Sequence, residues 1–181
     1  MQIKRPLRAL SLLAAMLAIP LLAPAQISVG LSVNFAPPVL PVYVQPPVPG
    51  PDYLWAPGYW AWGPDGYYWV PGTWVLAPTP GFLWTPGYWG WGGGVYLWHA
   101  GYWGPHVGFY GGVNYGFGFG GHGFEGGYWN GGHFFYNTAV VNVGAAHIGY
   151  VYSRPVMAGA AVRSSFNGGP GGIAAQPNAE E

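Results

Sequence analysis

The segment Tyr53-Leu54-Trp55-Ala56-Pro57-Gly58-Tyr59-Trp60-Ala61-Trp62-Gly63 returns almost unchanged as Phe82-Leu83-Trp84-Thr85-Pro86-Gly87-Tyr88-Trp89-Gly90-Trp91-Gly92. Five tryptophans each recur 29 positions later: Trp55, Trp60, Trp62, Trp69 and Trp74 correspond to Trp84, Trp89, Trp91, Trp98 and Trp103. Because tryptophan is a rare residue, five coincidences in one register indicate an internal duplication. The sequence therefore predicts tandem tryptophan-rich hairpin repeats over 53–104, with copies at 53–81 and 82–104.

Each copy divides into two half-units with the pattern Trp-x-Pro-Gly-x-Trp. The predicted turn residues are Pro57, Gly58, Pro71, Gly72, Pro86 and Gly87, and the fourth half-unit has Ala100 in place of proline. Proline fixes φ and glycine accepts positive φ, so a central Pro-Gly fits a type II turn. Such turns would place Trp55 opposite Trp60 and Trp69 opposite Trp74, as cross-strand aromatic pairs.

The connections between half-units differ from the Pro-Gly pairs. Gly63-Pro64-Asp65-Gly66 suits a type I turn followed by a left-handed glycine, whereas Gly92-Gly93-Gly94 is looser. We therefore predict a mainly β fold, an antiparallel meander of short hairpins that forms a small sheet or a partly closed barrel. Alternation with period two would gather the tryptophans on one face of the sheet.

The N-terminus has the organisation of a secretory signal peptide. Lys4, Arg5 and Arg8 precede an apolar run over 9–22, and Ala23-Pro24-Ala25 is a small-x-small cleavage pattern. The apolar run is shorter than the ~20 residues that span a bilayer, so an uncleaved anchor is the less favoured alternative. We predict a signal helix over 1–25 and a mature chain without a transmembrane span, located in the periplasm, the outer envelope or outside the cell.

Charge and cysteine content narrow the possible partners. Cleavage after Ala25 would leave Arg154 and Arg163 against five carboxylates, a formal charge of 2 − 5 = −3. That balance argues against nucleic acid and against electrostatic adsorption to anionic lipid. The chain contains no cysteine, which excludes disulfides and a lipid anchor on cysteine.

The segments that flank the repeats have distinct compositions. Residues 26–52 are proline-rich, which predicts an extended linker, with a rigid stalk or a docking peptide as alternatives. Residues 105–152 are rich in glycine and aromatics, which predicts a further β region; a low-complexity segment, either disordered or self-associating, is the alternative. Residues 153–181 are predicted to be a flexible tail, disordered from Ser164 onward.

The side chains that usually carry chemistry are scarce. Nucleophilic catalysis needs a Ser, Thr or Cys beside an oriented base, and Asp65 and Glu125 lack a nearby second acid in the sequence. We therefore predict no enzymatic activity, no catalytic residue and no cofactor. The histidines, spaced by 7, 16, 11 and 14 residues, match no compact metal motif: His99, His106, His122, His133 and His147. Packing is the favoured interpretation, with metal binding or pH sensing as alternatives.

The motifs resemble the YXWGXW, or WXXGXW, repeat-containing proteins of bacteria. The resemblance rests on Tyr59-Trp60-Ala61-Trp62-Gly63, on the matching segment 84–91, and on the stretch 98–112, and it covers roughly 53–172. This copy departs from the pattern at Thr73, which is not aromatic, and at Ala100. The resemblance implies an exported envelope protein, largely uncharacterised, and implies no established activity.

The aromatic face of the repeats has two interpretations, a structural core or a ligand-stacking surface. The residues concerned are Trp55, Trp60, Trp62, Trp69, Trp74, Trp84, Trp89, Trp91, Trp98 and Trp103. We predict an exported cell-envelope structural or interaction protein that acts through this aromatic repeat surface, by self-association or by binding an envelope component. The alternative is a glycan or cell-wall binding module that uses exposed Trp and Tyr side chains.

Overall fold

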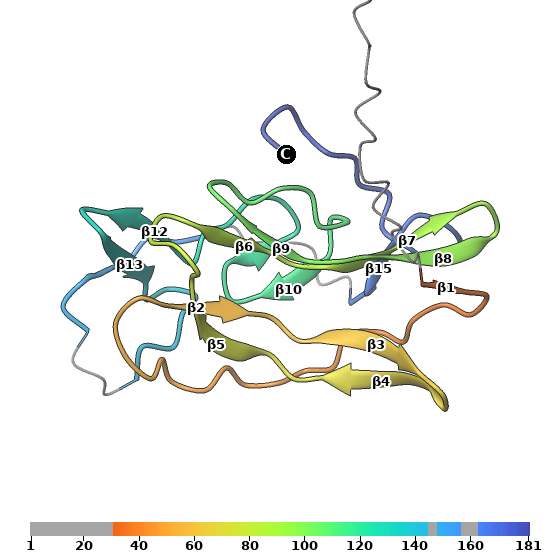
Figure 1. Cartoon of the computed structure of the whole chain (residues 1–181), viewed down its shortest axis with the longest axis horizontal. Coiled ribbons are helices and arrows are strands. Elements are labelled where there is room, and N and C mark those ends of the chain that lie inside the picture. Colours follow the sequence, from red (N-terminus) through yellow and green to blue (C-terminus); the bar gives the residue numbers. More distant parts are fainter. Residues whose placement is uncertain (1–30, 145–147, 157–162) are drawn as a thin grey trace, which may run out of the picture.

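The computed structural model describes residues 31–144, 148–156 and 163–181 (Figure 1). Within these ranges the regular secondary structure consists of strands alone, which confirms the prediction of a mainly β fold. The predicted signal helix, 1–25, lies outside the described residues. A search of the described residues finds no helix that is long and apolar enough to cross a membrane.

The first repeat folds as one long hairpin that is interrupted halfway along its length. Its strands are β2 (Tyr53–Ala56), β3 (Tyr59–Gly63), β4 (Gly66–Val70) and β5 (Thr73–Leu76). β3 pairs with β4 next to the tip, and β2 pairs with β5 next to the base, both antiparallel (Figure 1).

The second repeat has the same plan. Its strands are β6 (Leu83–Thr85), β7 (Tyr88–Gly92), β8 (Val95–His99) and β9 (Tyr102–Gly104). β7 pairs with β8 near the tip and β6 pairs with β9 at the base. Duplication of the sequence therefore gives duplication of the hairpin.

The predicted Pro-Gly turns are wrong. Trp55 faces Trp74 and not Trp60, because the chain continues in the same direction through Pro57-Gly58. Trp60 faces Trp69 for the same reason. A type II turn needs positive φ at its glycine. Positive φ is found at none of the four glycines in the interruptions, Gly58, Gly72, Gly87 and Gly101. Proline has no N–H for the strand ladder, so pairing stops there without reversing the chain.

The true reversals lie at the tips of the two hairpins. Gly66 has φ of 106°, which confirms the left-handed glycine predicted after Pro64-Asp65. In the second tip Gly93 and Gly94 have φ of 61° and 87°. Positive φ at both central residues is the requirement of a type I′ turn, which matches the twist of the paired strands. The glycine run is therefore a tight turn and not a loose one.

Two short strands extend the second hairpin on both sides. β1 (Ser32–Val33) pairs antiparallel with β8, and β15 (Phe166–Asn167) pairs parallel with β7. The result is a four-stranded sheet in the order β1-β8-β7-β15. Chain segments before and after the repeats thus meet on the second repeat.

The glycine- and aromatic-rich region forms two further sheets. β10 (Asn114–Gly116) pairs with β11 (Phe119–Gly120). β12 (Gly127–Asn130), β13 (His133–Asn137) and β14 (Val151–Tyr152) form a three-stranded sheet in which β14 runs parallel to β13. The described strands make several small open sheets, and none of these sheets closes into a barrel.

The two flanking segments are parts of the packed structure. The proline-rich segment is extended, as predicted, but it is not a free linker, because Val33, Leu40 and Val48 are buried. In the predicted flexible tail, Phe166 is only 6% exposed and Ser165 is buried. Both corrections have one cause: these segments cover aromatic surface that the short strands leave open.

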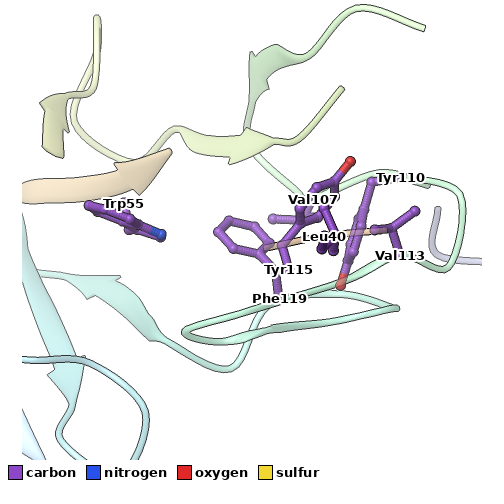
Figure 2. Close-up of a cluster of buried hydrophobic side chains, with 7 residues drawn as sticks. All are labelled: Leu40, Trp55, Val107, Tyr110, Val113, Tyr115 and Phe119. Atoms are coloured by element: carbon purple, nitrogen blue, oxygen red, sulfur yellow. The ribbon is translucent and has the colours of Figure 1, made fainter. Parts of the chain in front are cut away.

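Three clusters of buried side chains form the core, and the largest joins segments that are far apart in sequence. Figure 2 shows Trp55 of β2 at one end of this cluster and Leu40 of the proline-rich segment among side chains from 107–119. Its buried members are Leu40, Trp55, Val107, Tyr110, Val113, Tyr115 and Phe119. The core is therefore mostly aromatic and is shared by the repeats and their flanks.

Candidate functional site

The repeat tryptophans form cross-strand pairs inside each hairpin. In every half of a hairpin, one tryptophan from each strand meets the other edge-on or tilted, a geometry favoured by the ring quadrupole. The ring centroids are 5.1 Å apart in Trp55–Trp74, 5.4 Å in Trp60–Trp69, 5.3 Å in Trp84–Trp103 and 5.3 Å in Trp89–Trp98. Each such pair contributes about 0.5–1.5 kcal/mol beyond the burial of its area.

Each interruption brings two glycines together under tryptophan rings. A Cβ atom on Gly87 would lie 2.5 Å from Cζ2 of Trp98 and 2.8 Å from the backbone nitrogen of Gly101. A Cβ on Gly101 would meet Trp84 in the same way, also at 2.5 Å from Cζ2. Glycine is thus required at these positions because a Cβ atom would not fit, and not because of the backbone φ angle. This explains the Trp-x-x-Gly-x-Trp spacing: the first tryptophan covers the glycine of the opposite strand, and the second pairs with the opposite first tryptophan.

A sequence model of the WXXGXW repeat matches the chain in two copies, over residues 50–75 and 80–103. The chain therefore contains two copies of the WXXGXW repeat. The two matched ranges coincide with the two interrupted hairpins. No curated protein and no solved structure gives a significant match to the chain.

The aromatic face of the first WXXGXW repeat is covered by the chain's own proline-rich segment. Three ring donors of the hairpin bind backbone carbonyls of that segment. The bonds are Tyr67 Oη to Phe35 O at 2.9 Å, Trp60 Nε1 to Val39 O at 3.2 Å, and Trp74 Nε1 to Pro46 O at 3.0 Å. Aromatic grooves that bind extended proline-rich peptides use the same kind of contact. The segment interpreted as a spacer therefore docks on its own repeat.

The second WXXGXW repeat uses its indoles differently. Trp89 is 1% exposed and donates its Nε1 hydrogen to the carbonyl of Trp60 at 2.8 Å, so it joins the second hairpin to the first. The Tyr115 hydroxyl donates to Gly87 O at 2.6 Å, inside the interruption of the second hairpin. Hydrogen bonds from side-chain N–H and O–H groups thus connect sheets that share no backbone hydrogen bonds.

Burial differs among the predicted site residues. Trp55 and Trp89 are core residues, at 2% and 1% exposure, whereas Trp91 is 37% exposed. The half-buried members are Trp60, Trp62, Trp69, Trp74, Trp84, Trp98 and Trp103. The WXXGXW tryptophans are therefore mainly structural, and most of their surface is not free to stack on a ligand.

A small group of buried polar atoms lies under the first repeat. Within the described part of the chain, these atoms find no partner at hydrogen-bond geometry: Tyr43 Oη, Gln45 Nε2 and Trp55 Nε1. Burial raises the pKa of Tyr43, and weaker contacts with the backbone of Gly58 and the Trp55 side chain oppose that rise. The phenol is therefore neutral at physiological pH.

A cavity of about 300 Å³ lies where the interruptions of the two WXXGXW repeats come together. Tyr59, Trp84, Trp98 and Tyr115 line it with their rings, and no charged residue is among the lining residues. Tyr59 and Trp98 stack at 5.1 Å across the two repeats. The cavity offers apolar surface with very few side-chain polar groups.

The histidines lie apart from one another in the described chain. His99 stacks on Tyr88 at 4.5 Å, and burial lowers the pKa of its imidazole. His122 contacts a carboxylate oxygen of Glu181 at 3.0 Å. Among the described residues no group of three or more potential metal ligands comes together. His147 lies outside the described residues.

The β12-β13-β14 sheet has a partly exposed row of rings that was not predicted. We call it the aromatic row, and its members in order are Tyr152, Tyr128, Phe135, Tyr150 and His133. Successive centroids are 5.3, 5.3, 5.0 and 4.3 Å apart. The sequence signal for it is weak alternation: Tyr128 and Asn130 on one strand, His133 and Phe135 on the next, around the glycines 131–132. The parallel partner strand could not be found from that pattern.

Proposed function

We propose that the protein is an exported, non-catalytic protein of the cell envelope that serves as a structural or interaction module. The observation that supports this most is the internal use of the repeat aromatics. The first repeat binds the chain's own proline-rich segment and the second binds the first through Trp89. The repeats thus form a rigid framework. Contacts with other molecules would be made by the aromatic side chains that remain exposed.

Export is the part of the proposal that can be tested most directly. The basic start, the apolar run 9–22 and Ala23-Pro24-Ala25 support it. Intact-mass analysis of the chain from fractionated cells should give a mature form that begins at Gln26, outside the cytoplasm. An Ala25→Arg variant should accumulate as the uncleaved form. A wild-type chain that keeps residues 1–25 and stays in the cytoplasm would contradict the proposal.

Self-association is the first mode of interaction that we propose. Tyr68 and Tyr102 of the repeats are 54% and 50% exposed, which is unusual for large aromatic side chains. Sedimentation velocity of the mature chain should show concentration-dependent assembly, and the pair of substitutions Tyr68→Ser and Tyr102→Ser should weaken it. A chain that stays monomeric at every concentration would exclude this mode.

The second candidate function is glycan or cell-wall binding. One observation favours it: the aromatic row is exposed on an open sheet face, and charged residues lie at both of its ends. The WXXGXW tryptophans, by contrast, are largely covered. The binding candidate is therefore moved from the repeats to the β12-β13-β14 sheet.

A further inference from the structure

We propose that the outer face of the β12-β13-β14 sheet binds an uncharged polysaccharide made of pyranose rings, which lies along the aromatic row. The inference deepens the glycan-binding candidate above by naming a site and a ligand class. It does not depend on the WXXGXW tryptophans or on where the protein is located.

Strand register explains why the rings share one face. Tyr128 pairs with Phe135, and Asn130 pairs with His133, so all four side chains point to the same side of the sheet. The alternate residues Phe134 and Tyr136 are 2% and 1% exposed and belong to the core on the other side. One side of the sheet therefore holds the domain together and the other is presented outward.

The parallel strand β14 lengthens the row. It pairs Tyr136 with Val151 and Asn137 with Tyr152, which puts Tyr150 and Tyr152 on the same side as Phe135. Tyr128 stacks on Phe135 with an interplanar angle of 10°, and His133 stacks on Tyr150 at 14°. Five rings from β12, β13 and the segment 150–152, which includes β14, thus lie in one contiguous row.

Three of the five rings in the row are open to solvent, and Phe135 and Tyr152 are half-buried. Tyr128 is 46% exposed, Tyr150 is 37% exposed, and the His133 side chain is 47% exposed. A contiguous exposed aromatic surface with a polar border is typical of an interaction site. Small molecules bind mainly in concave pockets, so a sheet face suits an extended chain better.

Polar groups border both ends of the row. At the His133 end, Asp52 accepts a hydrogen bond from the Phe134 backbone at 2.8 Å and lies 3.6 Å from His133 Nδ1. At the Tyr152 end, Arg154 lies 3.7 Å from Glu125, and both side chains are exposed, at 67% and 40%. Asn137 fixes that end because its Nδ2 donates to the carbonyls of both residues, at 3.0 and 2.9 Å.

This combination fits a pyranose better than other ligands. The electropositive C–H groups on a sugar ring face complement the negative face of an aromatic ring, while its equatorial hydroxyls point outward to donors and acceptors. Carboxylate and guanidinium groups at the border can bind such hydroxyls with charge-assisted hydrogen bonds. Acidic and basic groups are both present, so the surface does not favour a charged polymer. Single-stranded nucleic acid also stacks on aromatic rings, but it requires a basic groove, and the described residues contain two arginines against five carboxylates, a formal charge of 2 − 5 = −3.

Isothermal titration calorimetry with the mature chain tests the site. The probes are β-1,4-linked hexamers of glucose and of N-acetylglucosamine, with a dT oligonucleotide as the competing class. We expect binding of at least one hexamer and none of the oligonucleotide. Tyr128→Ser and Tyr150→Ser should each lower the affinity about tenfold, the effect of losing one stacked ring.

A matched control separates the site from the general aromatic surface. Phe35→Ser removes an exposed aromatic side chain, 70% exposed, from the proline-rich segment, and it should leave the affinity unchanged. Aromatic proton shifts on addition of the hexamer should concentrate on Tyr128, Phe135, Tyr150 and Tyr152, and circular dichroism should show that every variant is folded. No binding of either hexamer at millimolar concentration, preference for the oligonucleotide, or an equal loss in Phe35→Ser would overturn the proposal. None of these results would bear on export, which the mass and fractionation experiment decides separately.

Discussion

The two WXXGXW repeats have the same hairpin but different surroundings. In both, four strands pair in two antiparallel segments, and tryptophans cover the glycines of an interruption. The first repeat is covered by the proline-rich segment, through the indoles of Trp60 and Trp74. The second repeat pairs with β1 and β15 and inserts Trp89 against the first. The repeat motif therefore encodes a hairpin, and segments outside it decide how each hairpin is buried.

The feature that the two repeats share should be the most sensitive to substitution. Gly58→Ala and Gly87→Ala would each place a Cβ between a tryptophan ring and the opposite backbone, at 2.8 Å from Val70 O in the first repeat and from Gly101 N in the second. Backbone atoms cannot yield as a flexible side chain can. We expect each variant to lose about 3 kcal/mol of unfolding free energy in urea titrations.

Gly120→Ala is the control for this pair. Gly120 lacks positive φ, and an added Cβ would meet nothing within 4 Å. It should therefore change stability by less than about 0.5 kcal/mol. If Gly58→Ala were tolerated while Gly87→Ala was not, the interruptions would not be equivalent, and the steric account of the motif would be wrong for the first repeat.

Substitutions in the proline-rich segment that covers the first repeat should have the next largest effect on stability. Leu40 is 7% exposed and belongs to the main core cluster, whereas Val42, two residues away, is 83% exposed. Leu40→Ala should cost about 2–3 kcal/mol by leaving a cavity, and Val42→Ala should be nearly neutral, both measured by thermal and urea unfolding. A proline-rich segment that acted only as a spacer would make both substitutions neutral.

Equivalent tryptophans of the two repeats should respond unequally. Trp89→Phe removes a buried indole and leaves the Trp60 carbonyl without its donor, which should cost about 2 kcal/mol. Trp60→Phe at the corresponding position of the first repeat removes a more exposed hydrogen bond to Val39 O and should cost about 1 kcal/mol or less. Equal losses would mean that the repeat motif, and not its surroundings, sets the energetics.

The sequence predicted what depends on local pattern. Duplication, strand content, the left-handed Gly66 and the extended form of the proline-rich segment all follow from spacing or from single-residue preferences. The direction of the chain at Pro57-Gly58 does not follow from local pattern. Proline and glycine permit a turn there, but pairing of β2 with β5 places the same residues in a strand interruption, and that pairing spans about twenty residues.

The candidate site was less predictable than the fold. Tryptophan richness pointed to the repeats as a binding surface, yet their rings meet one another and the chain's own backbone. The aromatic row depends on the parallel pairing of β13 with β14, which brings Tyr150 and Tyr152 beside Tyr128. No local pattern encodes such a contact, because parallel partners are distant in sequence.

The smallest predicted effect concerns residues that pack near the second repeat. Burial tends to raise the pKa of Glu181, but hydrogen bonds from the Asn178 backbone, from His122 and from the Gly123 backbone outweigh it, so the pKa is lowered. A lowered folded-state pKa stabilises the fold above the ordinary carboxyl pKa, and this contribution is lost as the pH falls through the folded value. Glu181→Gln should therefore cost about 0.5 kcal/mol at pH 7 and nothing in strong acid, as expected for a carboxylate held by partly exposed hydrogen bonds. Urea unfolding across that pH range measures the difference, with Glu180→Gln as the matched change in charge. A loss that persisted unchanged in acid would show that Glu181 acts through packing and not through its charge.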